Sequence, residues 1–124
     1  MFLIDSNIII YLISNNKKII KQMEKFEGKP CLISAISRLE VLFGVAKHNQ
    51  PVERTIRMID KYPALPIYNE TVDKAFNMRH QDKVSLKFKD LLIAGTAIEH
   101  KFTLITADKE FKKVKNLQVE LLKI

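Results

Sequence analysis

The chain has 124 residues, which is the length of one domain with a hydrophobic core of its own. Its 47% hydrophobic and 28% charged residues are typical of a globular protein and exclude the disordered and integral membrane classes. The formal net charge of +7 favours a polyanionic partner, nucleic acid before an acidic protein, for a single domain over residues 1–124.

The first third of the chain predicts two strands, each followed by a helix. Phe2–Ile4 is short and fully apolar, which is typical of a strand buried on both faces of a parallel sheet. A lysine-rich segment with apolar residues at helical spacing follows and ends at Gly28. Cys31–Ile33 is the second predicted strand, and a helix over residues 36–47 comes after it.

The middle of the chain predicts a helix, an edge strand and a second helix. Pro51 opens the first helix. The strand Ala64–Ile67 contains Pro66, which confines it to an edge of the sheet. Asn69 is the predicted N-cap of the second helix. The first helix is predicted to have Val52, Ile56 and Ile59 on its inner face, and the second carries the apolar residues Val72, Ala75 and Phe76.

The last third predicts a central helix and two more strands. Phe88–Glu99 is the most apolar helical segment, so we expect it to be buried on several sides. Phe102–Thr106 is a strand, and the strict alternation of Leu117–Leu121 predicts a half-exposed edge strand. Strands that alternate with helices predict an α/β fold, in which a largely parallel sheet is covered by helices on both faces.

The apolar start of the chain does not have the pattern of an export signal. The stretch Phe2–Ile13 has no basic segment before it, contains Asp5, and is shorter than the roughly 20 residues that span a bilayer. Cys31 is the only cysteine, which excludes an internal disulfide, and its apolar neighbours suit a small core residue. We therefore expect a cytoplasmic protein with no membrane contact.

Two acidic residues directly follow predicted strands. Asp5 comes after the first strand, and Asp108 comes after the strand Phe102–Thr106. Active sites in parallel sheets lie beyond the carboxyl ends of the strands. We therefore expect both carboxylates at the same rim of the sheet.

Two further acids stand among apolar residues near the starts of predicted helices. Glu40 has Ile36, Phe43 and Gly44 at helical spacing, and Asp90 has alanine and isoleucine residues on its own face. A helix that joins parallel strands runs antiparallel to them, so its first turns lie at the carboxyl rim of the sheet. The four acids are therefore predicted to converge.

Converged carboxylates favour a divalent cation, because like charges disfavour the ionised form of their neighbours. Carboxylate oxygens are ligands for Mg²⁺ or Mn²⁺, which fill their remaining positions with water or substrate phosphate. Such ions activate water and stabilise the transition state of phosphoryl transfer. The chemistry that the four acids indicate is phosphodiester hydrolysis.

Structural roles remain open for the first two acids. Asp5 alone could cap a helix beginning at Ile8, and this explanation is as good as ligation for a single acid. Ser37 and Glu40 have the spacing of a capping box, although a helix start near Ser34 argues against it.

The other two acids have structural explanations as well. Asp90 could interact with the dipole of its helix, and Asp108 could cap a short turn over residues 109–113. The occurrence of four acids at one rim favours the chemical role over these separate local ones.

These residues resemble the PIN domain, and within it the VapC toxins of prokaryotic toxin-antitoxin pairs. The resemblance covers nearly the whole chain, and its motifs occur in the expected order. It is carried by Leu3-Ile4-Asp5-Ser6-Asn7, by Ile33-Ser34 with Glu40 and Gly44, by Asp90-Leu91-Leu92-Ile93-Ala94 with Ala97, and by Leu104-Ile105-Thr106-Ala107-Asp108 with Phe111.

The resemblance implies a fold and an activity. The fold is a three-layer sandwich whose central, mainly parallel sheet has about five strands in the order 3-2-1-4-5, flanked by helices. The activity is that of a metal-dependent endoribonuclease that cuts RNA by water attack and uses Mg²⁺, for which Mn²⁺ substitutes. The implied partners are an RNA substrate, a second copy in a homodimer, and an antitoxin that wraps an apolar groove near the first two helices.

The resemblance also assigns roles to individual residues. The implied catalytic centre comprises four acids, three of which are the implied metal ligands, with Asp5 and Asp90 the leading pair. Three polar residues match positions that support the acids by hydrogen bonding. The catalytic residues are Asp5, Glu40, Asp90 and Asp108, the metal ligands are Asp5, Asp90 and Asp108, and the supporting residues are Ser6, Asn7 and Thr106.

The chain departs from the family pattern before its third acid. The stretch His80–Ser85 lacks a glycine that is often present, and Lys87-Phe88-Lys89 brings no additional acid near Asp90. We interpret Lys87 and Lys89 as contacts to RNA phosphates.

Two other interpretations compete with a ribonuclease. A haloacid dehalogenase-like phosphatase has a second acid at the position of Asn7, and a receiver domain needs an acidic pair where only Asp5 is present. The other alternative is a non-catalytic module that binds RNA or a partner. Metal-dependent RNA cleavage separates these classes.

Overall fold

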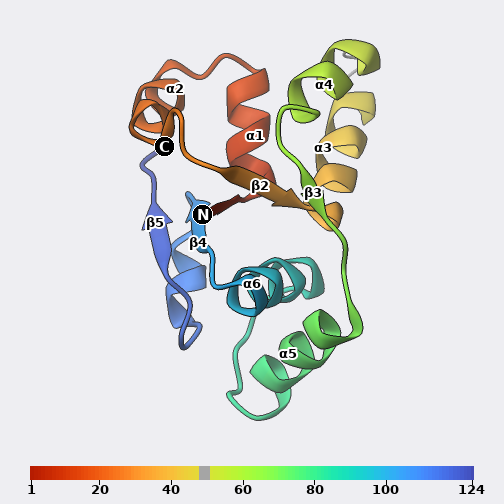
Figure 1. The fold of residues 1–124 in the computed structure, drawn as a ribbon, viewed down its shortest axis with the longest axis vertical. Helices are drawn as coiled ribbons and strands as arrows, with labels where there is room; N and C mark the ends of the chain where they lie inside the picture. The colour runs from red at the N-terminus through yellow and green to blue at the C-terminus, as the bar shows by residue number, and fades with distance from the viewer. Residues whose placement is uncertain (48–50) are drawn as a thin grey trace.

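The computed structural model describes residues 1–47 and 51–124 and places the chain around one five-stranded parallel sheet (Figure 1). The sheet order is β3-β2-β1-β4-β5, which confirms the predicted order. Within the described residues, no helix has both the length and the apolar character needed to cross a membrane. In chain order the elements are β1 (Phe2–Ile4), α1 (Ser6–Ile13), α2 (Lys17–Met23), η1 (Glu24–Phe26), β2 (Cys31–Ser34), α3 (Ala35–Lys47), α4 (Val52–Ile59), β3 (Ala64–Leu65), α5 (Asn69–His80), α6 (Phe88–His100), β4 (Thr103–Thr106), η2 (Lys109–Lys113) and β5 (Val119–Leu121).

Strand β1 lies at the centre of the sheet, between β2 and β4. All four strand pairs are parallel, and Leu3 pairs with Leu32 on one side and with Leu104 on the other. Leu3 and Ile4 are fully buried, as the apolar run predicts. The chain leaves this central strand directly at Asp5, so the carboxylate begins at the middle of the rim.

The helices form a layer on each face of the sheet, which confirms the three-layer sandwich. Helices α1 to α4 lie above the sheet in Figure 1, and α5 and α6 lie below it. Leu3 and Leu104 belong to the core beneath α6, whereas Ile4 and Ile105 belong to the core beneath α1. Successive strand residues therefore face opposite layers, which is the period of two that a doubly covered strand requires.

Helix α5 differs from its prediction at its start, and not all of its apolar residues are buried. Tyr68 occupies the N-cap position instead of Asn69, and its backbone N–H donates to the Thr71 hydroxyl at 3.2 Å. Of its three apolar residues identified from the sequence, Val72 and Phe76 are exposed and Ala75 is buried. The buried stripe runs through Thr71, Ala75 and Met78 because that side of α5 packs on α6.

Three smaller predictions also need correction. Val52 is exposed at the start of α4, while Ile59 at its other end is fully buried. Strand β3 has two residues instead of the predicted four, because the chain leaves the edge at Pro66. Cys31 is half-buried rather than a core residue.

The two glycines inside helices provide a test of this packing. A Cβ at Gly44 would meet only the end of the Ile10 side chain at 3.7 Å, whereas a Cβ at Gly95 would lie 3.0 Å from the Thr71 carbonyl oxygen of α5. Gly44→Ala should raise the free energy of unfolding by about 0.5–1 kcal/mol through helix propensity. Gly95→Ala should lower it by about 1–3 kcal/mol, because α5 must move away.

Urea unfolding of the two variants and the parent measures both changes. Stabilisation by Gly95→Ala would show that α5 and α6 are not packed as closely as the structure has them.

Candidate active site

Asp5 is a buried acid at the carboxyl end of the central strand. Its residue is 3% exposed, and its backbone N–H donates to the Ile105 carbonyl oxygen at 2.9 Å, continuing the β1–β4 ladder. The Thr106 hydroxyl donates to Asp5 Oδ2 at 2.7 Å, and the Ser6 hydroxyl lies 3.5 Å from Oδ1. Strand β4 and the start of α1 therefore hold this residue and its carboxylate in place.

The capping explanation for Asp5 is wrong. Helix α1 begins at Ser6, not Ile8, and although Asp5 occupies its N-cap position, the carboxylate makes no capping hydrogen bond to the helix. Its oxygens are turned toward Thr106 and Ser6 instead. The side chain is thus available to the rim of the sheet.

The environment of Asp5 disfavours its ionised form. Burial raises the pKa of this carboxyl from 3.8 to about 6, and the negative charges of Asp90 and Glu40 add to the rise. The hydrogen bond from Thr106 works in the other direction and lowers the pKa. A cation placed among these three acids would remove the repulsion between them.

Glu40 reaches the same place from α3. Its Oε1 accepts a hydrogen bond from the Ser6 hydroxyl at 3.2 Å, so one hydroxyl lies between Glu40 and Asp5. Its Oε2 lies 2.8 Å from the Lys89 amine. The capping box with Ser37 is wrong, because α3 begins at Ala35 and Ser37 lies inside its first turn.

Asp90 lies in the first turn of α6 and is half-buried. Burial raises the pKa of its carboxyl, and the negative charges of Glu40 and Asp108 raise it further. The positive charges of Lys87 and Lys89 lower it. The Asp90 carboxyl is therefore repelled by one acid from α3, Glu40, and by another from the loop after β4, Asp108.

Asp108 has a local structural role, as its capping explanation predicts. Its Oδ1 accepts a hydrogen bond from the Glu110 backbone N–H at 2.9 Å at the start of η2. Its own backbone N–H donates to the Thr106 hydroxyl at 3.1 Å. Thr106 thereby links Asp108 to Asp5, so a cap and a place at the acidic rim are compatible.

The three predicted supporting residues differ in their contacts. Ser6 and Thr106 both donate to carboxylates of the site. Asn7 is exposed, and no side-chain hydrogen bond joins it to an acid in the part of the chain that the structure describes. Of the two predicted RNA contacts, Lys87 is exposed at the N-cap position of α6, and Lys89 is paired with Glu40.

The Lys89–Glu40 pair is the feature of the site that the sequence does not reveal. The hydrogen bond and the charge of Glu40 raise the pKa of Lys89 above its ordinary value. Only a lysine close to the third acid was visible in the sequence, with no indication of which carboxylate it faces. The pairing depends on how α3 and α6 approach each other at the rim.

The donor chemistry of the rim fits a divalent cation. Its oxygens are carboxylates, and burial together with the negative charges of Asp90 and Glu40 raises the pKa of Asp5. As these side chains are placed, no three Asp, Glu, His or Cys residues within residues 1–47 and 51–124 form a group that could hold a metal ion. Side chains of the rim must therefore rearrange before they could hold a metal ion, and Glu40 would have to turn away from Lys89 to take part.

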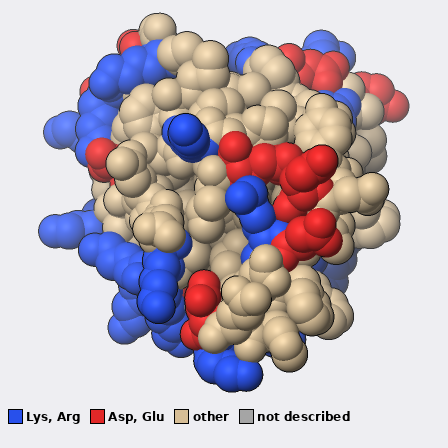
Figure 2. All heavy atoms as spheres, turned by 60° about the horizontal axis from the view of Figure 1, so that its bottom comes forward, with Lys and Arg blue, Asp and Glu red and all other residues tan. Residues whose placement is uncertain are grey.

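The molecular surface shows how these charges are distributed. On the face that carries α5 and α6, acidic side chains gather around basic ones, and Lys and Arg side chains occupy much of one edge (Figure 2). Neutral side chains cover most of the remaining face. The acidic group is therefore local, within a chain whose net charge is +7.

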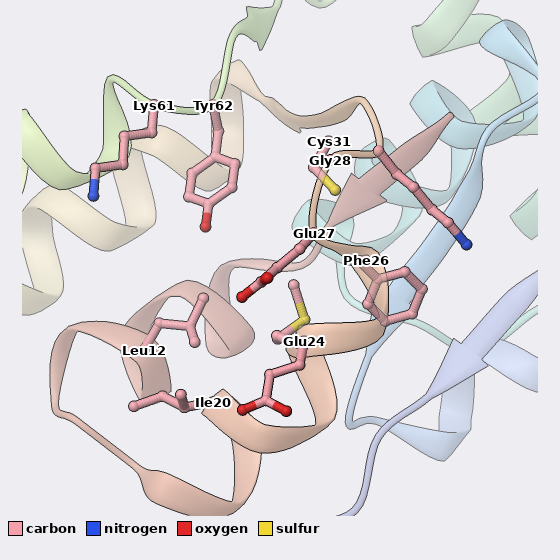
Figure 3. A pocket seen from close by; sticks show the side chains of 11 residues that line it. Leu12, Ile20, Glu24, Phe26, Glu27, Gly28, Cys31, Lys61 and Tyr62 are labelled. Carbon is pink, nitrogen blue, oxygen red and sulfur yellow. The ribbon is translucent and has the colours of Figure 1, made fainter.

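A hollow of about 570 Å³ lies at the opposite end of the sheet from the acids. It is bordered by Cys31, the first residue of β2, and by the last turn of α1 and the helix α2. Leu12, Ile20 and Met23 provide apolar walls. The Tyr62 and Glu27 side chains point into this space (Figure 3).

An apolar groove of about 660 Å³ lies between α5 and α6. Its lining includes Val72, Phe76 and Phe88, which are 49%, 61% and 75% exposed. Phe88 is in the same helical turn as Asp90. Exposed apolar surfaces of this kind are typical of protein contact sites.

Comparisons with known proteins give a consistent result. The family model described as "PIN domain" matches residues 2–117. Ribonuclease VapC1 from Rickettsia felis is 32% identical over 127 aligned positions, covering 94% of this chain and 92% of the relative. A chain of a toxin-antitoxin complex from Klebsiella pneumoniae is 27% identical with a TM-score of 0.85, and the match covers 100% of both chains. A chain of VapBC-1 from nontypeable Haemophilus influenzae is 28% identical with a TM-score of 0.75, covering 97% of this chain and 96% of the other.

The raised pKa of Asp5 predicts a pH-dependent destabilisation of the metal-free protein. Well below pH 3.8 the carboxyl is protonated in both the folded and the unfolded state, so it has no effect. Well above pH 6 it is ionised in both, and the shift from 3.8 to about 6 makes folding less favourable by roughly 3 kcal/mol. Asp5→Asn should therefore stabilise the protein by about 1–3 kcal/mol at pH 7.5 in EDTA, and most of this gain should be lost by pH 4.

Urea unfolding between pH 4 and pH 8 measures this difference. Asp73→Asn, which makes the same change at an exposed position of α5, is the control and should change stability little at any pH. A gain for Asp5→Asn that is independent of pH would contradict the raised pKa.

Proposed function

The chain belongs to the PIN domain family, and from this premise we propose that it is a divalent-metal-dependent endoribonuclease, the toxin of a type II toxin-antitoxin pair. The observation that carries the proposal is the convergence of Asp5, Glu40 and Asp90 at the carboxyl rim, where burial and the charges of the other two acids raise the pKa of Asp5. A relative named as a ribonuclease supports the substrate, and a similar chain from a toxin-antitoxin complex supports the biological role.

The proposed mechanism assigns a task to each acid. Asp5, Asp90 and Asp108 would hold Mg²⁺, or Mn²⁺ in its place, and Glu40 would complete the acidic centre with a further oxygen once it turns away from Lys89. When bound, the divalent ion supplies an activated water and positive charge for the phosphoryl transition state. Thr106 and Ser6 hold the Asp5 carboxylate in place through their hydroxyl groups, and Ser6 also holds Glu40. Asn7, as a third supporting residue, would have to turn toward the acids.

The proposed substrate approaches a rim with two lysines beside the third acid. Lys87 is exposed, and the Lys89 side chain is 54% exposed, so both amines are accessible from solvent. RNA phosphates are neutralised by such side chains, and the net charge of the chain favours the approach of a polyanion. A cytoplasmic location follows from this substrate.

The proposed antitoxin occupies the hollow beside α1 and α2. Its apolar walls, Leu12, Ile20 and Met23, can receive side chains of a wrapping segment. The positive charge of the chain fits acidic residues elsewhere on such a partner.

The proposed homodimer uses the groove between α5 and α6. Phe76 and Phe88 are the most exposed aromatic residues of this face, and burying them against a second copy would remove apolar surface from water. Phe88 would then bring the contact to the turn that carries Asp90.

Metal-dependent RNA cleavage tests the proposed activity. The parent protein should cut RNA with Mg²⁺ or Mn²⁺ and should not cut in EDTA. Asp5→Asn and Asp90→Asn should each lower the cleavage rate at least about a hundredfold, because each removes a charged ligand. Asp73→Asn on the exposed side of α5 is the matched control and should cut at the parental rate.

The same measurement separates a nuclease from a non-catalytic module. Cleavage that survives in both Asp5→Asn and Asp90→Asn would come from another site or a contaminant and would refute the assignment. A parent that binds RNA without cutting it under either metal would favour the binding module.

Salt dependence tests the two proposed RNA contacts. In EDTA, where no cutting is expected, the Lys87→Ala/Lys89→Ala protein should show a shallower dependence of log K on log salt. Each phosphate of single-stranded RNA that the variant no longer neutralises should reduce the slope by about 0.7. The control Lys17→Ala/Lys21→Ala removes the same charge from exposed positions of α2, away from the four acids in the chain, and should leave the slope closer to that of the parent. An unchanged slope in the first variant would exclude Lys87 from the RNA interface of the metal-free protein.

A further inference from the structure

Lys89 forms an ion pair with Glu40, whereas the described residues show no such pair for its neighbour Lys87. Its amine lies 2.8 Å from Glu40 Oε2, while the Ser6 hydroxyl donates to Oε1 at 3.2 Å. Both oxygens of Glu40 are therefore engaged, one of them by a full positive charge. The Glu40 side chain is 20% exposed, so this pair is partly shielded from water.

Among the described residues, Glu40 is the acid of the centre that forms an ion pair with a basic side chain. It lies close enough to Asp5 and Asp90 for its charge to raise the pKa of both. In the described part of the chain, the ion pairs give Glu40 a basic partner and give Asp5 none. One amine at Glu40 thus provides part of the neutralisation that a divalent ion would provide for the whole centre.

The Lys89 amine and a divalent ion would compete for the same carboxylate, that of Glu40. An ion among Asp5, Asp90 and Glu40 would repel the ammonium group, and the ammonium group already holds one of the oxygens that the ion would use. Thermodynamic linkage makes the effect reciprocal. The ion pair between Lys89 and Glu40 weakens the affinity for the metal ion, and a bound metal ion weakens the ion pair by the same free energy. The exposed stem of Lys89 allows the amine to swing toward solvent when it is displaced.

We propose that Lys89 is an exchangeable counter-ion of the acidic centre: it pairs with Glu40 in the metal-free protein and is released toward the RNA phosphates when Glu40 turns to a divalent ion. This inference rests on the proposed function, because the ion is the one that the nuclease would use. Lys89 acts on the metal through Glu40 and is therefore a positioning residue. Under this proposal, Lys89 contacts RNA only when a divalent ion is bound at the acidic centre.

Lys87 is the matched control for this role. Its charge lowers the pKa of Asp90, as the charge of Lys89 does, so the two lysines act on the third acid at a distance in the same way. Lys87 makes no ion pair with Glu40 among the described residues. A difference between the two lysine variants therefore measures the contact with Glu40 and not the general loss of positive charge.

Mn²⁺ titration in the absence of RNA tests the competition. Lys89→Met should lower the dissociation constant for Mn²⁺ about fivefold, the equivalent of the strongest exposed ion pairs, whereas Lys87→Met should change it less than about twofold. In a Glu40→Gln background, Lys89→Met should lose its effect, because the pair no longer exists. Both substitutions are at positions open to solvent, and Glu40→Gln keeps the shape of the side chain.

RNA binding in EDTA tests the release. With Glu40 in place, Lys87→Met should make the salt dependence shallower and Lys89→Met should not. In the Glu40→Gln background, where the amine is free, Lys89→Met should also make it shallower, by about 0.7. This readout requires neither metal nor cleavage.

Two results would overturn the inference and leave the proposed nuclease intact: equal Mn²⁺ affinity for Lys89→Met and the parent, or an effect of Lys89→Met that persists with Gln at position 40. A parent protein that cuts RNA only with Mg²⁺ or Mn²⁺ would still support the proposed function in either case. A parent that binds no Mn²⁺ at all would overturn both.

Discussion

The acidic site is built around one energetically unfavourable feature, the buried carboxylate of Asp5 at the end of the central strand. Burial and the charges of two other acids oppose its ionisation, and the hydroxyl of Thr106 offsets only part of this. The placement persists because β1 is paired on both sides, which leaves the chain no freedom to turn Asp5 outward. The stability of the sheet thus keeps the Asp5 carboxylate buried, although electrostatic repulsion and desolvation favour its exposure to water.

The overall fold was predictable because it depends on short-range patterns. Apolar runs with polar boundaries identified β1 and β4, the proline at position 66 placed β3 at an edge, and the alternation before Leu121 placed β5 at the other. The sequence is less informative about helix faces. Val52, Val72 and Phe76 have the spacing of core residues but are exposed. Periodicity shows that a helix has an apolar face and does not show whether that face meets the core or remains at the surface.

The acids of the site were also predictable in position, although not in their contacts. Strand ends and helix starts share a rim in any parallel α/β sheet, so Asp5, Glu40, Asp90 and Asp108 were expected together. The local sequence does not show which carboxylate oxygen accepts a hydrogen bond from which donor. Asp108 proved to cap η2 and to stay at the rim, because Thr106 binds both its backbone and Asp5. The pair between Lys89 and Glu40 depends on the approach of α3 and α6, which no periodic pattern encodes.

The two unpartnered apolar surfaces differ in what a bound partner could influence. The hollow beside Leu12 lies at the amino ends of the strands, one helix length away from Ser6 along α1. The groove between α5 and α6 includes Phe88, in the same turn as Lys89 and Asp90. A contact at Phe88 would restrict the backbone that carries both the third acid and the counter-ion of Glu40, whereas a contact at the hollow could reach the acids only by extending along α1. The groove is therefore the surface from which binding can most directly alter the acidic centre.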